Sequence, residues 1–384
     1  MTGAMYAAIA GLRTHMQNLN VIGNNVANVN TYGYKSARSV FKTALYTTLS
    51  GGSDGTTVVG GANPSQIGYG STMGSIGIDM STGNYAVTGR PMDLMLDGEG
   101  FFITGDKTIA GQFTGTGADQ TVLNGMKLTR VGNFEFGADG YLAKEDGSGC
   151  VYGFMVKGTD AAGNPIFSDQ LVPIRYPSIQ KNDDGSVTLV YCQEDGQGGA
   201  GGAGTATRFE EPKDDDGNLL PKAAFYGVTI DKNTGIITGT CKDTGELATI
   251  GVIAVGQVKN PNGVTNLGDN YYQAGKGSGG MSVSLLGGAA RSMFGTDADA
   301  DGTVYYMNGE LLGNNQGAND DRSDVCRLLS AGETRVLQSG LEMSKTDLAQ
   351  EISQMILTQR GYQANTRIIT VTDSMLEELV NMKR

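Results

Sequence analysis

The chain has 384 residues, of which 60 are glycine and none is tryptophan, and it carries a net charge of −12 at pH 7. This acidic balance argues against nucleic acid or an anionic membrane surface as a partner, because both would repel the chain. The length predicts two or three domains and the glycine content predicts turn-rich β structure, while no apolar run approaches the roughly 18 residues of a membrane-spanning helix.

The first predicted element is an amphipathic helix within residues 1–34. Its apolar residues recur in steps of three and four, as in a coiled coil, and neighbouring alanines favour helix. We call this stripe the N-terminal seam; it comprises Met5, Ile9, Leu12, Met16, Leu19 and Val26. An asparagine cluster that begins at Asn24 is expected to end the helix, because asparagine competes for backbone hydrogen bonds. The N-terminus lacks a basic segment followed by an apolar one, so a conventional secretory signal is not expected.

The next segment, residues 35–70, is polar and rich in glycine, with Gly51-Gly52-Ser53-Asp54-Gly55 at its centre. This composition is typical of a connection without a packed core. The sequence therefore predicts an extended linker here.

The middle of the chain predicts β structure in three parts. Short apolar strands flank Asp97-Gly98 and Asp139-Gly140, which are hairpin signals. Residues 71–155 and 255–335 are accordingly predicted as the two parts of an inner β domain. Between them, residues 156–254 carry strand candidates separated by Gly-rich and Asp-rich loops, and they are predicted as an inserted outer β domain.

The last predicted element is a long helix within residues 336–384. Ser344 followed by Asp347 predicts a capped start, and the helix would be on the order of 50 Å long at about 1.5 Å per residue. Its apolar stripe, the C-terminal seam, comprises Leu348, Ile352, Met355, Tyr362, Ile369, Leu376 and Val380. So long a seam needs a partner, and the first helix carries a matching one, which predicts paired terminal helices. The alternative is two amphipathic helices on an ordinary core.

No set of residues has the spacing of a catalytic or cofactor site. The one histidine, His15, lies beside the N-terminal seam and is predicted to be a surface or interface residue. A G-x-S-x-G match at 51–55 and a G-x-G-x-x-G match at 196–201 lack the strand and helix that these motifs require. We therefore expect neither an enzyme nor a bound cofactor. The cysteines show no C-x-x-C pairing and are expected to be buried free thiols, with a long-range disulfide as the alternative: Cys150, Cys192, Cys241 and Cys326.

One acidic segment could bind a metal ion. Asp297, Asp299, Asp301 and Gly302 match the first half of an EF-hand-type calcium loop, in which alternate carboxylates converge on the cation. The twelfth position is Asn308, where a bidentate glutamate is wanted. A solvated acidic turn is therefore favoured, with calcium binding as the alternative.

Both ends of the chain resemble a known family. The motif NNVANVNTYGYK at residues 24–35 resembles the N-terminal signature of the flagellar rod and hook family of axial proteins, and GYQANTRIITVTDSMLEELVNMKR at residues 361–384 resembles its C-terminal signature. LDGEGFFIT, LTRVGNFEFGADGYL and KNPNGVTNLGDNYY resemble the inner β domain of that family. The signature positions are Asn24, Asn25, Asn28, Asn30, Gly33, Tyr34, Lys35, Arg360, Gln363 and Asn365.

The resemblance implies a mainly β, elongated protein with paired terminal helices, which polymerises with copies of itself through the two seams. Hook members carry a large insertion and shorter rod members lack one, so residues 156–254 favour the hook branch. That branch forms a curved tube that transmits torque as a universal joint. The resemblance also implies rod proteins, a hook cap and hook-filament junction proteins as partners. It further implies export through the type III apparatus without a cleaved signal, and a place in the extracellular hook-basal body.

Two alternatives stay open from the sequence. The first is a distal-rod protein of the same family, which would be straight and stiff. The second is a secreted β-rich adhesin or carbohydrate-binding module with helical oligomerisation ends. The second alternative requires exposed aromatic residues clustered on one strand face, such as Tyr271 and Tyr272, to form a binding platform.

Overall fold

The computed structural model describes residues 2–55, 60–107, 125–159, 165–167, 171–181, 187–191, 193, 194, 209, 210, 212, 219–286, 304–307, 310–312, 326–328 and 334–382. The chain divides into two compact units. Unit 1 comprises Met1–Met80 and Ser344–Arg384, and unit 2 comprises Ser81–Met343. The expectation of a mainly β protein with a helix at each end is confirmed. Within the described residues, no helix is both long enough and apolar enough to span a membrane.

Unit 1 contains the two long helices, α1 (Thr2–Ala27) and α4 (Leu348–Met382). The carboxylate of Asp347 caps α4, because its Oδ1 accepts hydrogen bonds from the backbone N–H of Ala349 (3.0 Å) and Gln350 (3.2 Å). The predicted cap at Ser344 is wrong, since its hydroxyl bonds to the Thr346 hydroxyl instead. The helix therefore begins at Leu348, well inside the predicted segment 336–384, whose first residues are strands of unit 2.

The segment predicted as an extended linker is a two-stranded antiparallel ribbon in unit 1. Its strands are β1 (Ala37–Thr43), β2 (Tyr46–Ser50), β3 (Ser65–Gly68) and β4 (Ser71–Ile78), with β1 paired to β4 and β2 paired to β3. A further bridge joins Ser53 to Ala62. Valine, phenylalanine, tyrosine and threonine in these segments favour strands. The glycines that suggested a linker lie mostly between and beyond the paired positions.

Unit 2 is built from short strands. Its strands up to residue 181 are β5 (Tyr85–Val87), β6 (Asp93–Asp97), β7 (Phe101–Gly105), β8 (Lys127–Thr129), β9 (Gly132–Phe136), β10 (Leu142–Lys144), β11 (Cys150–Thr159), β12 (Pro165–Phe167), β13 (Val172–Pro173) and β14 (Ser178–Lys181). The later strands are β15 (Val187–Val190), β16 (Gln193–Glu194), β17 (Phe209–Glu210), β18 (Phe225–Ile230), β19 (Ile236–Cys241), β20 (Leu247–Val258), β21 (Thr265–Gly268), β22 (Tyr271–Gln273), β23 (Met281–Leu285), β24 (Val304–Met307), β25 (Glu310–Leu312), β26 (Cys326–Leu328), β27 (Arg335–Gln338) and β28 (Gly340–Glu342). A short 3-10 turn, η1 (Pro261–Gly263), precedes β21.

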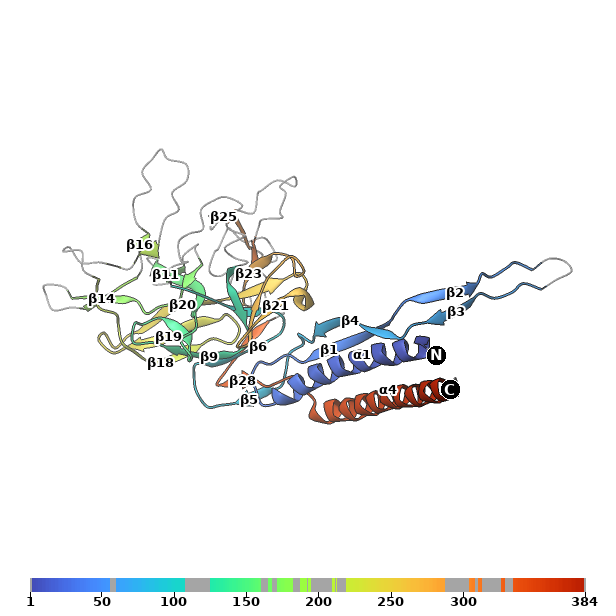
Figure 1. Ribbon diagram of the computed structural model, residues 1–384. Coiled ribbons are helices and arrows are strands. Elements are labelled where there is room, and N and C mark those ends of the chain that lie inside the picture. The colour runs from blue at the N-terminus through green and yellow to red at the C-terminus, as the bar shows by residue number, and fades with distance from the viewer. Residues whose placement is uncertain are drawn as a thin grey trace. The chain divides into compact units, whose positions relative to one another are not determined.

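Among the described residues, one sheet of 15 strands organises unit 2 (Figure 1). Its main path runs β21-β22-β8-β7-β20-β11-β10-β9-β6-β27, and β12, β13, β18, β19 and β23 branch from it. Large apolar side chains fill its core, among them Leu94, Phe102, Phe134, Ile253 and Val336. This core extends over strands from the predicted inner and outer domains alike.

Two predictions about unit 2 need correction. The boundaries at 156 and 254 fall inside β11 and β20, and β20 pairs with β7, β11, β19 and β23. The predicted outer domain therefore shares its sheet with the inner strands. The Asp139-Gly140 hairpin does form, between β9 and β10, with Gly140 at φ 76°. The Asp97-Gly98 hairpin does not, because β6 pairs with β9 and β27, and β7 pairs elsewhere.

Candidate assembly interface

Helices α1 and α4 of unit 1 lie side by side and run antiparallel (Figure 1). Near the middle of the pair, a Cβ on Gly11 would lie 2.6 Å from Asn365 Nδ2, and a Cβ on Gly361 would lie 2.7 Å from His15 Cε1. Both glycines therefore allow a close approach of the helices. Further along, Asn18 Nδ2 donates to Thr358 Oγ1 (2.8 Å).

The fourth contact of this series joins Asn25 to Glu351. Asn25 Nδ2 donates to Glu351 Oε1 at 2.9 Å. From Gly11, the contacting residues of α1 advance by 4, 3 and 7 positions, while those of α4 retreat from Asn365 by the same intervals. One antiparallel register thus holds over the length of the contact. We call these four contacts the polar ladder.

The contact face between the helices is small and polar. On α1 the buried residues are Ala8, Gly11, Thr14, Asn18, Ile22 and Asn25, and on α4 they are Thr358 and Thr372. Thr14 Oγ1 and Asn18 also reach the ribbon, since Thr14 donates to Ser71 O (3.0 Å) and Ser39 Oγ donates to Asn18 Oδ1 (2.5 Å). Apart from Ile22, the buried side chains of this face are therefore small or form hydrogen bonds.

Asn25 forms a buried junction between α1, the turn that follows it and α4. It is 1 % exposed. Its Nδ2 donates to Ala37 O (2.8 Å) as well as to Glu351, and its Oδ1 accepts from Ala37 N (2.9 Å) and from Tyr34 Oη (3.0 Å). The amide thus uses both its donor and its acceptor groups. The junction fixes the start of β1 against the end of α1.

The turn after α1 holds the other buried signature residues. Gly33 has φ 67°, a left-handed conformation that favours glycine, and Tyr34 and Lys35 are buried directly after it. The backbone carbonyl of Tyr34 accepts a hydrogen bond from Lys345 N (3.1 Å), so this turn also holds the approach to α4.

Burial perturbs the acidic groups of the junction. Desolvation raises the pKa of the Glu351 carboxyl, and the nearby Asp347 charge adds to the increase, while the hydrogen bond from Asn25 opposes it. Desolvation, with the Glu351 charge, also raises the pKa of the Tyr34 phenol. Compared with full exposure to water, the junction therefore favours the neutral forms of Glu351 and Tyr34.

The two seams lie largely outside this contact. Four N-terminal seam residues are half-buried and two are exposed, with Met16 at 51 %. In the C-terminal seam, Met355 and Ile369 are half-buried, whereas Val380 is 65 % exposed. The remaining residues of that seam are exposed as well: Leu348, Ile352, Tyr362 and Leu376. The buried face of α1 is offset by about one residue, or roughly 100° of helix rotation, from the predicted seam.

The other signature residues do not converge on one point. Asn24 Nδ2 donates to Tyr34 Oη (3.1 Å), and Asn28 Nδ2 donates to Asn24 O (2.9 Å). Asn30, Arg360 and Gln363 are exposed, whereas Asn365 belongs to the polar ladder. The structure thus brings the N-terminal signature together around Asn25 and leaves much of the C-terminal signature on the surface.

The ribbon adds a second exposed apolar surface to unit 1. Along its strands and tight connections the exposed apolar residues are Val40, Phe41, Leu45, Tyr46, Leu49, Ile67, Tyr69 and Ile76. Nothing in its composition as a polar, glycine-rich segment indicated this surface. A two-stranded ribbon is marginal alone in water, so these side chains favour a partner.

Sequence reasoning missed Gly11, Asn18, Thr358 and Gly361, since it followed apolar residues only. A weak signal was present. Small or hydrogen-bonding residues recur on α1 at the same three-to-four spacing, but one position away from the apolar ones. Helix α1 thus carries an apolar stripe and, beside it, a stripe of small and polar residues. The sequence of α1 alone does not show which of the two stripes packs against α4.

Several other predicted features can now be placed. Tyr271 and Tyr272 are 4 % and 1 % exposed, so these two residues do not form the exposed platform that the carbohydrate-binding alternative requires. Cys150 and Cys241 are buried free thiols. Asp297, Asp299 and Asp301 lie outside the described residues. Within the part of the chain that is described, no three His, Cys, Asp or Glu side chains gather closely enough to hold a metal ion.

Comparison with known proteins gives matches at both ends and over the whole chain. Residues 5–35 match the family described as "Flagella basal body rod protein", and residues 337–382 match "Flagellar basal body rod FlgEFG protein C-terminal". The flagellar basal-body rod protein FlgG of Bacillus subtilis is 30% identical over 387 aligned residues, with both chains covered in full. The flagellar hook proteins FlgE of Borreliella burgdorferi and Treponema pallidum are 26% and 25% identical over 462 and 484 aligned residues, again with full coverage of both chains.

These alignments differ in length. The alignments with the two hook proteins are much longer than the 384 residues of this chain, so those relatives contain residues that have no counterpart here. The alignment with the rod protein leaves almost none. At 25–30% identity to members of both branches, these matches do not separate the hook branch from the rod branch.

Proposed function

The chain belongs to the family of flagellar rod and hook proteins, and on this premise we propose that it is the subunit of the flagellar hook, which polymerises into a curved tube that transmits torque. Members of the family are structural parts of the flagellum. The observation that carries the proposal is the outward position of both seams in unit 1. The polar ladder forms the contact between α1 and α4, and the apolar seams are left available to contact neighbouring copies.

Exposed seams favour an open polymer. Each copy offers the two helical seams and the apolar ribbon, which are different surfaces of the same unit. When one kind of surface contacts a different kind on the next copy, the contact repeats without closing and generates a helical assembly. Each apolar side chain removed from water contributes about 1.5–3 kcal/mol. A handful of seam residues can therefore supply the driving force for assembly.

The remaining roles follow from membership of the hook branch. The subunit would follow the rod proteins, grow beneath a hook cap and end at hook-filament junction proteins. It would be exported through the type III apparatus and act in the extracellular hook-basal body. Torque passes along such a tube when the helices resist twist, while polar contacts between outer parts of unit 2 allow bending.

Negative-stain microscopy of the purified full-length chain under salting-out conditions tests the proposal. Short curved tubes are expected. Ile352→Glu with Val380→Glu places charges in the C-terminal seam and should abolish tubes. The matched control, Gln350→Glu with Asn381→Glu, adds the same charges at exposed positions off the seam and should form tubes. Failure of the parent chain to polymerise, or tubes from the seam variant, would contradict the proposal.

A rod subunit is the second candidate. It is favoured by the full-length match to the Bacillus subtilis rod protein, whose identity of 30% is higher than the 26% and 25% of the two hook proteins. A rod is straight, so the same micrographs decide between the two candidates. Straight tubes from the parent chain would assign it to the rod, and curved tubes would assign it to the hook.

A further inference from the structure

The chain enters unit 2 at residue 81 and leaves it at residue 343, and the strands nearest to these two connections, β5 and β28, are adjacent. β5, near its first residues, pairs antiparallel with β28, at its end, through Val87 with Gly340, Ala86 with Leu341 and Tyr85 with Glu342. Met343 N donates to Asn84 O at 2.8 Å. A pair with three residues in each strand is too short to be stable by itself. Other contacts must hold the β5–β28 pair, which we call the exit of unit 2, in place.

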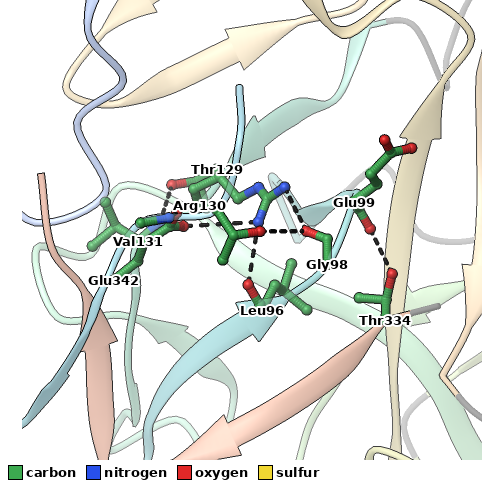
Figure 2. Close-up of polar contacts among 10 residues, drawn as sticks. Leu96, Gly98, Glu99, Thr129, Arg130, Val131, Thr334 and Glu342 are labelled. Carbon is green, nitrogen blue, oxygen red and sulfur yellow. Dashed lines mark hydrogen bonds and ion pairs between the residues drawn. The ribbon is translucent and has the colours of Figure 1, made fainter. Parts of the chain in front are cut away.

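A buried ion pair lies at this exit (Figure 2). The side chains of Arg130 and Glu342 are 2 % and 0 % exposed, with Arg130 Nη1 3.8 Å from Glu342 Oε2. The other carboxylate oxygen, Glu342 Oε1, accepts a hydrogen bond from Gly83 N (2.6 Å). Glu342 therefore contacts both connections at once, because Gly83 leads into β5 and Glu342 ends β28.

Arg130 in turn joins this exit to the body of unit 2. Its Nη1 donates to Leu96 O (3.3 Å) and its Nη2 to Gly98 O (2.8 Å), at the end of β6 (Figure 2). Its guanidinium also lies 5.5 Å from the ring centroid of Phe101. Nearby, Thr334 Oγ1 donates to Glu99 O (2.8 Å), which holds the start of β27 to the same turn.

Thermodynamic stability does not explain this pair. Burying two charges carries a desolvation penalty that offsets much of their attraction, and well-packed apolar replacements are often as stable. What the ions provide is position. A guanidinium that is bound to two carbonyls and one carboxylate fixes where β28 and residue 83 lie relative to β6.

We propose that Arg130 and Glu342 form a clasp that holds the two connections of unit 2 against mechanical load. This inference rests on the proposed torque-bearing function, since any force that reaches unit 2 along the chain enters through residue 81 or residue 343. The clasp passes that force from the short β5–β28 pair to β6 and the large sheet. Arg130 and Glu342 are thus positioning residues for load transfer.

Hydrogen exchange of the full-length chain, followed by mass spectrometry, tests the clasp. Arg130→Met with Glu342→Leu replaces the pair by apolar side chains of similar size. Amides of residues 83–87 and 340–343 should then exchange about tenfold faster or more, while the rest of unit 2 keeps its protection and its Tm. Unchanged exchange at these strands would overturn the proposal, and so would a uniform loss of protection across unit 2.

A matched control uses an exposed ion pair of the same unit. Arg90 and Glu145 are 2.9 Å apart, and each side chain is 49 % exposed. Arg90→Met with Glu145→Leu should leave exchange at β5 and β28 unchanged, and acceleration there would also overturn the assignment. Optical-tweezers pulling on the two chain termini adds a mechanical readout, in which only the Arg130–Glu342 variant should release β5 and β28 at lower force.

Tube formation separates this inference from the function on which it rests. The clasp variant should still polymerise, because its substitutions lie in unit 2, whereas the seams and the ribbon belong to unit 1. Absence of tubes from the parent chain would refute the hook proposal, whatever the exchange data show. Tubes from both chains with identical exchange and release force would refute the clasp alone.

Discussion

The two units of this protein bury opposite kinds of side chain. In unit 2, the core strands bury large apolar residues completely, such as Phe102, Phe134 and Val336. In unit 1, the helices bury small and hydrogen-bonding residues, such as Asn18 and Asn25, and leave Met16 and Val380 in contact with water. Unit 2 is thus packed around its own apolar core, as in an ordinary globular domain. Unit 1 leaves apolar side chains of its seams and ribbon exposed, which under the proposed function are available for contact with neighbouring copies.

The difference indicates that unit 2 provides most of the folding stability and that unit 1 provides the surfaces proposed for assembly. The apolar burial that stabilises a domain is concentrated in unit 2. The polar ladder of unit 1 contributes alignment, because hydrogen bonds have a small net effect on stability but a strict geometry. Mutations should therefore separate the two units: changes in unit 2 should act on folding, and changes in the seams should act on polymerisation.

The largest expected effect is a core truncation in unit 2. Phe102 is fully buried and packs edge-to-face on Phe134, with ring centroids 4.9 Å apart. Phe102→Ala should lower the free energy of unfolding of unit 2 by about 3–5 kcal/mol, because it leaves a cavity. Urea denaturation measures this loss. Leu247→Ala, at a position 73 % exposed, should change it by less than about 0.5 kcal/mol.

The next effect concerns the junction of unit 1. Asn25→Ala leaves the Ala37 backbone groups, the Tyr34 hydroxyl and the Glu351 carboxylate without their shared partner. The helices should lose about 2–3 kcal/mol of stability, measured from their circular dichroism signal in a urea titration. The control is Asn20→Ala on the exposed side of α1. Equal effects of the two substitutions would mean that the junction has no special role.

Truncation of a seam should act on assembly alone. Leu376→Ala with Val380→Ala removes apolar area that is exposed in the subunit. The critical concentration for polymerisation should rise about tenfold, which corresponds to about 1.4 kcal/mol. The Tm of the free subunit should stay within about one degree of the parent. A loss of subunit stability without a change in critical concentration would mean that these seam residues act on folding and not on assembly.

The smallest effect is the pH dependence of the helix pair. Because burial raises the pKa of Glu351 above its ordinary value of 4.5, the folded pair binds a proton more readily than the unfolded chain. The resulting stabilisation is fully present below that ordinary value, and it is lost as the pH rises through the raised value. Helix melting at several pH values measures it. Glu351→Gln should flatten the profile, and a parent profile that is already flat would refute the assignment.

The sequence predicted the helices well because heptad spacing persists over many turns. It could not predict which face of each helix packs inside the subunit. Apolar residues mark a face that favours apolar surroundings, yet Leu376 and Val380 are exposed in the subunit. Gly11 and Thr358, which lie in the contact between the helices, carry no such mark. The polar ladder depends on pairs more than 300 residues apart in the chain, and no local pattern sets their register.

In the β part, local signals succeeded where the partner strand is local. Gly140 closes a hairpin between sequence neighbours, so its turn chemistry was sufficient. Asp97-Gly98 begins a turn whose strands pair with β9, β27, β8 and β20, and that choice is made by burial across the whole sheet. The same reason explains why an outer domain at 156–254 was wrongly separated: β20, a strand of 12 residues, crosses the boundary at 254, and its four partner strands come from both predicted domains.

The antiparallel course of α1 and α4 brings both chain ends to the same end of the helix pair (Figure 1). Extending the register from Gly11 and Asn365 places Thr2 beside Ser374, and Met382 lies only about 12 Å further along the helix axis. Fluorescent dyes on the two termini would therefore exchange energy efficiently while the helices are paired, and would cease to do so when they separate. A pair of terminal dyes would thus report directly whether the two helices of a subunit are paired.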